Sequence, residues 1–185
     1  MINALREELL AMIAEEEFLT AALETAGELD DVDVAAAHPE LRAVQARHHE
    51  RLWAMLDDLE TWPGRRLAGD DGAEAAWRIA QRALLDPELQ RRCVEQLEVA
   101  VALGDAEPRH YAALFDRLCM AEGRDQVFGS QFVASADGAT AVPWPIADVL
   151  NVDERRARVG LGPLAAHARV MRDAYAQRRP VSAGP

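Results

Sequence analysis

Residues 38–64 read HPELRAVQARHHERLWAMLDDLETWPG, and this stretch decides the class of fold. One set of positions recurs every three or four residues, which is the spacing of one face of an α-helix. These positions are Leu41, Val44, His48, Leu52, Met55 and Leu59. Pro39 favours a helix start, because the first turn needs no hydrogen bond from its nitrogen. The run Trp62-Pro63-Gly64 predicts where the helix stops.

Helices of the same period are predicted on both sides of this stretch. We expect them at residues 4–26, from Ala73 to Leu85, from Asp86-Pro87 to Gly104, from Pro108 to Gly123, from Asn151 to Val159 and from Pro163 to Tyr175. Asp86 and the run Asn151–Glu154 have the composition of helix N-caps. The glycines between Gly64 and Gly72 predict an exposed loop. The acidic run Glu15-Glu16-Glu17 is interpreted as the solvated face of the first helix.

The pattern changes in the last third of the chain. Residues 126–133 favour a strand, and Asp137-Gly138 is typical of a tight turn before Thr140–Val142. We therefore expect a mainly α fold, a helical bundle of about six to seven helices with one small β-hairpin near the C-terminal third. It should form a single domain over residues 1–178, with a frayed tail over residues 179–185.

The charge of the chain argues against two classes of partner. The formal net charge is −12 and the pI is about 4.8. Such a chain repels phosphate backbones and anionic lipids, so we expect no nucleic acid and no membrane as partner. The start has no basic stretch followed by an apolar one, and the apolar run at residues 99–103 is too short to cross a bilayer. These features predict a cytoplasmic protein.

Motifs that would hold a cofactor or a metal are missing from the sequence. It contains no Gly-x-Gly-x-x-Gly, P-loop, Gly-x-Ser-x-Gly, His-Glu-x-x-His or Cys-x-x-Cys. Cys93 and Cys119 each stand among apolar residues, which is typical of buried, reduced thiols. We therefore expect no cofactor and no tightly bound metal ion.

Several polar residues are candidates for a site. His48 lies on the apolar stripe, whereas His49 points about 100° away, so the two rings cannot readily hold one metal. His48 is either a hydrogen-bonded core residue or an acid–base group in a pocket wall. Gln126 and Gln131 either orient a polar ligand or satisfy backbone groups where a helix meets a strand. Trp77, like Trp62, is either a core anchor or an aromatic wall of a binding pocket.

A family resemblance covers Trp62 to Leu164. Its landmarks are Trp62-Pro63, Ala75-Ala76-Trp77, Gln81, Asp86-Pro87-Glu88, Gln90, Tyr111, Asp116-Arg117, Gly123, Gln126–Gln131, Val152–Arg156 and Gly160–Leu164. On these residues the chain resembles the uncharacterised bacterial family called domain of unknown function 6624. The segment Gln126–Gln131 is similar to the family's Gln-x-Tyr-Gly-Thr-Gln and is the most distinctive part. Since the family has no agreed function, the resemblance implies an architecture and no activity.

The chain departs from the family pattern at one polar position. Family members usually have a Gln-His-Ala-Asp run where this chain has Gln81-Arg82-Ala83-Leu84. If that histidine is the family's acid–base group, this protein has lost or reassigned the step. Arg82 is either an ordinary exposed arginine or a clamp for a carboxylate or phosphate.

The candidates lead to a functional hypothesis and one alternative. We expect a cofactor-independent protein that binds a polar small molecule, with His48 and Arg82 as catalytic residues and Gln126, Gln131, Trp77 and Gln81 as the substrate-binding residues. The favoured activity is acid–base chemistry on a metabolite, as in a lyase, an isomerase or cyclase, or a hydrolase. A tailoring step in biosynthesis is one such role. The alternative is a non-catalytic module that docks a partner protein.

Overall fold

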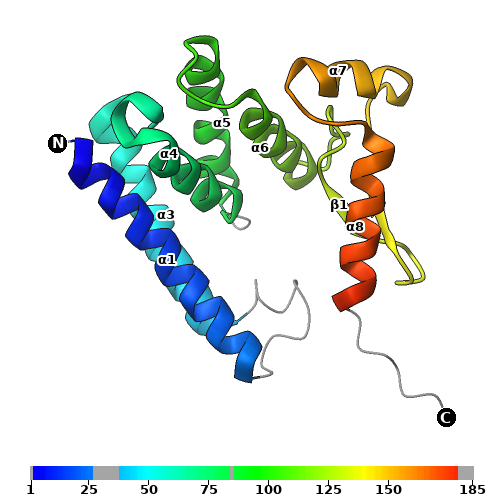
Figure 1. The fold of residues 1–185 in the computed structure, drawn as a ribbon, viewed down its shortest axis with the longest axis horizontal. Coiled ribbons are helices and arrows are strands. Elements are labelled where there is room, and N and C mark those ends of the chain that lie inside the picture. Colours follow the sequence, from blue (N-terminus) through cyan, green and yellow to red (C-terminus); the bar gives the residue numbers. More distant parts are fainter. Residues whose placement is uncertain (1, 27–37, 84–85, 179–185) are drawn as a thin grey trace.

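The computed structural model describes residues 2–26, 38–83 and 86–178. Within these ranges the chain forms seven α-helices and one two-stranded sheet, which confirms the mainly α prediction (Figure 1). The elements are α1 (Ile2–Ala26), α3 (Pro39–Leu59), α4 (Arg65–Gln81), α5 (Pro87–Ala102), α6 (Pro108–Ala121), β1 (Phe132–Ala134), β2 (Ala141–Pro143), the 3-10 helix η1 (Val149–Asn151), α7 (Val152–Arg158) and α8 (Leu164–Arg178). The tail predicted at residues 179–185 lies outside the described residues. No helix in the described ranges is both long enough and apolar enough to cross a bilayer.

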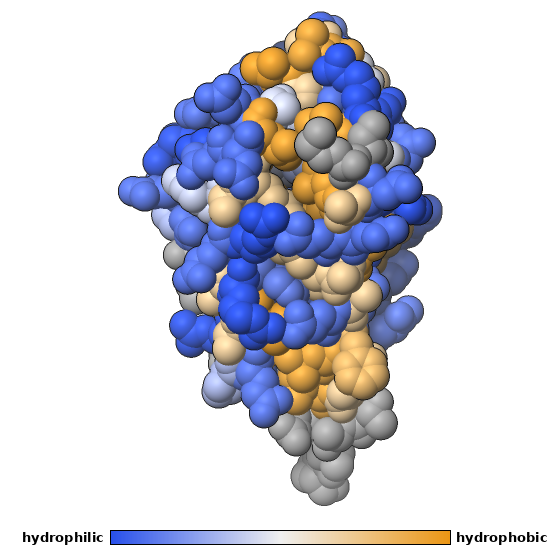
Figure 2. Space-filling model, turned by 90° about the vertical axis from the view of Figure 1, so that its left-hand side faces the viewer, coloured by the Kyte–Doolittle hydropathy of each residue, from blue (hydrophilic) through white to orange (hydrophobic). Residues whose placement is uncertain are grey.

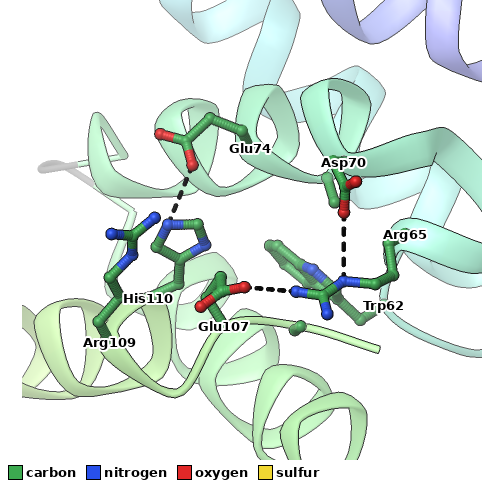
Figure 3. A pocket seen from close by; sticks show the side chains of 9 residues that line it. Trp62, Arg65, Asp70, Glu74, Glu107, Arg109 and His110 are labelled. Atoms are coloured by element: carbon green, nitrogen blue, oxygen red, sulfur yellow. Dashed lines mark hydrogen bonds and ion pairs between the residues drawn. The ribbon is translucent and has the colours of Figure 1, made fainter. Parts of the chain in front are cut away.

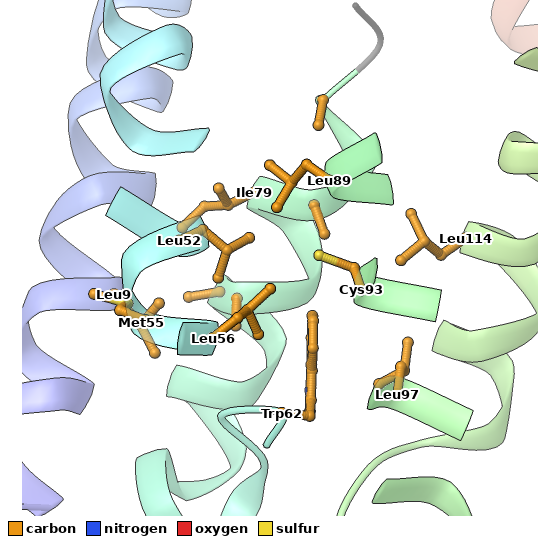
Figure 4. Close-up of a cluster of buried hydrophobic side chains, with 14 of the residues drawn as sticks. Leu9, Leu52, Met55, Leu56, Trp62, Ile79, Leu89, Cys93, Leu97 and Leu114 are labelled. Atoms are coloured by element: carbon orange, nitrogen blue, oxygen red, sulfur yellow. The ribbon is translucent and has the colours of Figure 1, made fainter. Parts of the chain in front are cut away.

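The main core lies where α1, α3, α4, α5 and α6 meet (Figure 4). Leu52 of the stripe in α3 is fully buried, together with Leu56 of the same helix, Ile79 of α4 and Leu97 of α5. Each such side chain contributes about 1.5–3 kcal/mol through burial. Trp62, just after α3, is only 1% exposed and stands among these side chains. It is therefore a core residue.

The prediction of a loop between Gly64 and Gly72 is wrong, because α4 begins at Arg65. Gly69 has a φ of 70° and a ψ of 173°, which are not helical values, so α4 is two helical segments joined by a kink at this residue. Gly72 lies on the helix where α1 passes closely, and a Cβ there would be 3.4 Å from the Cα of Arg6. These two glycines allow a bend and a close helix contact, so they do not mark a loop.

The C-terminal part is built on a short hairpin beside α6 (Figure 1). Phe132 pairs with Pro143 and Ala134 with Ala141 in an antiparallel register, and α8 packs against β2. The strand predicted over residues 126–133 is too long, because the N–H groups of Val127, Phe128 and Ser130 are not in a ladder. They donate instead to the buried carboxylate of Asp116, at 2.7, 3.0 and 2.9 Å.

Asn151 occupies the N-cap position of α7, where the sequence predicts the helix to start. Its side chain makes no capping bond to the first turn of α7. The Nδ2 group donates instead to Asp148, at 2.8 Å. Asp86, by contrast, caps α5 as expected, by accepting the N–H of Leu89 at 2.9 Å.

The face on which α1 lies is covered largely by hydrophilic side chains, with apolar ones showing between them (Figure 2). Exposed ion pairs tie α1 to its neighbours, among them Glu15 with Arg47 at 2.7 Å and Glu8 with Arg51 at 2.5 Å. Exposed pairs of this kind contribute about 0–1 kcal/mol each. The docking of α1 therefore depends mainly on its buried apolar face and on the buried side chain of Glu16.

Candidate functional site

The structure brings the two predicted catalytic residues together through a third residue. Glu16 of α1 accepts a hydrogen bond from His48 Nδ1 at 2.7 Å and one from Arg82 Nη1 at 2.7 Å. Its side chain is fully buried, so assigning the whole Glu15–Glu17 run to a solvated face is wrong at this position. A buried carboxylate requires such partners, because an unpaired charge in the interior is costly.

The charges in this cluster stabilise one another. Burial works against both charged forms, but the hydrogen bonds from His48 and Arg82 outweigh it and lower the pKa of Glu16. The hydrogen bonds to Glu16 and Glu15 likewise outweigh burial and raise the pKa of His48. Glu15 lies 3.0 Å from the Nε2 atom of His48, so carboxylates occupy both ring nitrogens. In this arrangement His48 is a charged link between α1 and α3.

The two predicted glutamines lie in the C-terminal part and contact each other. Gln126 Nε2 donates to the carbonyls of Gln131 and Trp144, at 3.0 and 2.7 Å, and its Oε1 accepts the N–H of Gln131 at 2.9 Å. Gln131 Nε2 donates to the carbonyl of Ala113 in α6, at 3.1 Å. Arg82 points to α1, so the structure does not bring it together with these amides.

The remaining two candidates lie on α4 and face α6. Gln81 Oε1 accepts a hydrogen bond from Arg117 Nε at 3.0 Å. The ring of Trp77 stacks on the ring of His110, with 4.2 Å between centroids and 10° between planes. Trp77 Nε1 also donates to the backbone carbonyl of His110, at 3.1 Å. Trp77 thus fixes a histidine that the sequence did not single out.

His110 borders a cavity of about 310 Å³ at the start of α6 (Figure 3). The cavity is lined by Trp62, Arg65, Asp70, Ala73, Glu74, Ala106, Glu107, Arg109 and His110. A second cavity, of about 410 Å³, is lined by Ala46, His49, Glu50, Trp53 and Asp86. Neither lining includes any of the six residues predicted from the sequence.

Contacts between residues far apart in the sequence position one wall of the first cavity. The N–H groups of Arg65 and Arg66 donate to the backbone oxygen and the carboxylate of Asp105, at 3.0 and 2.8 Å. Gly64 makes this approach possible, because a Cβ there would lie 2.4 Å from the Asp105 carboxylate. The start of α4 is thereby fixed to the connection between α5 and α6. This contact brings Arg65 within 2.5 Å of Glu107 across the cavity wall.

The electrostatics of His110 favour a neutral ring. Burial lowers the pKa of His110, and the nearby carboxylate of Glu74 only partly opposes this effect. Nε2 and Glu74 Oε2 are 3.0 Å apart, at ion-pair distance, and Figure 3 marks this contact. We assign the ring proton to Nε2, the nitrogen beside this carboxylate. Nδ1 is then an acceptor, and no described residue hydrogen-bonds to it. An imidazole held in this way can accept a proton from a ligand.

Sequence reasoning missed His110, although a weak pattern was present. His110, Leu114 and Leu118 follow one another at intervals of four on α6, so His110 continues an apolar stripe as His48 does. Nothing in the sequence showed that Glu74 and Trp77, more than thirty positions earlier, would contact this ring. Among the described residues, no group of three histidine, cysteine or acidic side chains is placed to hold a metal ion.

Comparisons with known proteins leave the activity open. No curated protein and no solved structure matches the chain. The sequence profile of one family, described as a family of unknown function, matches residues 3–179 and so covers nearly the whole chain. The protein therefore belongs to the family of unknown function DUF6624.

Proposed function

We propose that this protein binds a polar small molecule in the cavity beside His110 and acts on it by acid–base chemistry. One observation carries the proposal, namely that a neutral histidine with an unused nitrogen is held at a cavity lined by charged side chains. The stack on Trp77 and the contact with Glu74 fix the ring from two directions. A catalytic base needs such fixed orientation together with a pKa near or below neutrality.

Glu74 and His110 have the arrangement of a carboxylate–histidine dyad. In such a pair the imidazole accepts a proton on its free nitrogen, and the carboxylate stabilises the imidazolium that forms. Here Nδ1 of His110 would accept the proton, and the carboxylate of Glu74, 3.0 Å from Nε2, would stabilise the resulting charge. The group that gives up the proton would be an O–H, an N–H or an acidic C–H of the ligand. A lyase, an isomerase or cyclase, and a hydrolase each need a step of this kind.

The lining indicates what else the ligand carries. Arg109 is exposed at the cavity and has no ion-pair partner among the described residues, so it is available for an anionic group. Arg65 already contacts Glu107 and Asp70, at 2.5 and 3.4 Å. A cavity of about 310 Å³ is at the lower end of the range for small-molecule sites. These features favour a small carboxylate or phosphate ester that also carries a removable proton.

Deuterium exchange tests the proposal with defined probes. The protein is incubated in D₂O with 2-oxo acids of three to six carbons, and loss of the C–H signal next to the carbonyl is followed by proton NMR. We expect the protein to accelerate exchange of at least one probe, and His110→Phe to reduce that acceleration by about 10²–10⁴-fold. Phenylalanine keeps an aromatic ring against Trp77, so the stack is preserved.

His167→Phe is the matched control, since His167 lies on α8 against Phe132 and lines neither cavity. This variant should accelerate the deuterium exchange of the probe as much as the unmodified protein does. Equal rates for His110→Phe and the unmodified protein would overturn the assignment of His110. Acceleration of no probe would overturn proton abstraction from this ligand class.

A further inference from the structure

Arg117 is a half-buried charged side chain without a counter-charge among the described residues. It comes from α6 and lies against the C-terminal end of α4, where its Nε donates to Gln81 Oε1 at 3.0 Å. No carboxylate among the described residues pairs with it. Burial alone lowers the pKa of the guanidinium, and no neighbouring acid offsets it. A protein interior rarely holds a charge in this way, because burying an unpaired charge is costly.

Two other arginines, one half-buried and one fully buried, show which partners this protein usually gives to a guanidinium. Arg82 shares the buried carboxylate of Glu16. Arg156, only 2% exposed, donates to the carbonyls of Gly162 and Phe128, at 2.6 and 2.7 Å. A guanidinium has five N–H donors, and in Arg117 a single one of them has a hydrogen-bond partner among the described residues. The other four remain available to an acceptor.

Gln81 adds a second set of unused donors at the same place. Its Oε1 accepts from Arg117, which sets the orientation of the amide. Its Nε2 is buried and has no hydrogen-bond partner. Buried polar atoms are nearly always satisfied, so this Nε2 requires an acceptor that the described protein residues do not supply. The unpartnered groups of both residues are donors, and therefore the missing group is an acceptor.

We propose that Arg117 and Gln81 form a binding site for a small oxyanion, a carboxylate or a phosphate group, at the junction of α4 and α6. The planar fork of a guanidinium matches two oxygens of such a group. Part of Arg117 is open to solvent, so an ion can reach it. The site is separate from the His110 cavity, since seven residues of helix correspond to about 10 Å along α6.

A titration of side-chain NMR signals tests the site directly. Inorganic phosphate and, separately, acetate are added at constant ionic strength set with sodium chloride. The Arg117 Nε–H and the Gln81 amide signals are followed in proton–nitrogen spectra. We expect both sets of signals to move in a saturable way with at least one of the two ions, with a Kd on the order of 1 mM or tighter. The ion that produces the saturable shift identifies the class of ligand, and a response to neither ion overturns the proposal.

Variants separate the site from general charge effects. Arg117→Met should weaken the affinity for the responding ion at least about tenfold and abolish the rise in Tm that the ion produces. Arg124→Met is the control, because it removes an exposed arginine that pairs with Glu122 instead. It should bind the ion as the unmodified protein does. Unchanged binding in Arg117→Met overturns the proposal. Should that variant not fold, the titration of the unmodified protein still decides.

Discussion

Replacing Gln126 by alanine should unfold the C-terminal part far more easily. The amide of Gln126 is fully buried and bonds to three backbone groups, the N–H and C=O of Gln131 and the C=O of Trp144. The carbonyl of Gln131 also accepts the N–H of Trp144, at 3.0 Å, so it keeps one partner in the variant. The other two groups would be left unsatisfied.

The size of the loss follows from these two groups. An unsatisfied buried backbone group costs about 1–3 kcal/mol, so Gln126→Ala should lower the free energy of unfolding by about 4 kcal/mol. In urea, where small proteins have slopes of about 1–3 kcal/mol per molar, the unfolding midpoint should fall by about 2 M. Far-ultraviolet circular dichroism measures this midpoint. Gln177→Ala, on the exposed surface of α8, is the control and should change stability by less than about 0.5 kcal/mol.

The same experiment separates a structural amide from a ligand-binding one. A loss of unfolding free energy below about 1 kcal/mol in Gln126→Ala would refute the hydrogen-bond reasoning, since two unsatisfied buried groups should cost more than that. It would favour the role in ligand binding that the sequence predicted for Gln126. A large loss would show that the amide holds the segment after α6 in place.

Three further outcomes follow from single contacts. His48→Gln should destabilise the protein most below about pH 6.5, because an imidazolium stabilised in the folded state loses its effect once it deprotonates. The difference in the free energy of unfolding between the variant and the unmodified protein should shrink as the pH rises through the raised pKa of His48. Unfolding at several pH values measures this difference, and a pH-independent difference would contradict the prediction. Asp86→Ala should cost about 1 kcal/mol through loss of the cap on α5, measured by urea unfolding, and an unchanged midpoint would contradict the cap. Gly64→Ala should lower the free energy of unfolding by about 1–3 kcal/mol, because the new Cβ would clash with Asp105. Gly162→Ala should lower it little, because there is open space around Gly162. Equal Tm values for the two variants would contradict the close approach of Gly64 to Asp105.

The class of fold was predictable because local spacing determines it. The stripe in residues 38–64 predicts α3 within a few residues, and the stops at Gly104 and Gly123 also lie close to the ends of α5 and α6. The start of α4 was not predictable in this way. Gly69 and Gly72 are typical of a loop, but Gly69 only kinks α4, and Gly72 lies in the helix where it contacts α1.

The candidate site depended on contacts between distant residues, which spacing does not encode. His48 was chosen for its place on an apolar stripe, but Glu15 and Glu16, over thirty positions earlier, occupy both its nitrogens. His110 stands at an equivalent place on its own helix and keeps one nitrogen unused. The sequence shows two similar histidines, and only the partners supplied by the fold distinguish them.

The protonation state of His110 is the most direct test of the proposed site. Carbon and nitrogen signals of the ring are followed by NMR across the pH range, with His110→Phe used to assign them. The structure predicts a midpoint below the ordinary value of about 6.5, and a ring at pH 7 with the proton on Nε2. Glu74→Gln should lower the midpoint further, because the carboxylate raises the pKa of this ring. A midpoint above about 6.5, or a proton on Nδ1 at pH 7, would contradict a free base at this cavity.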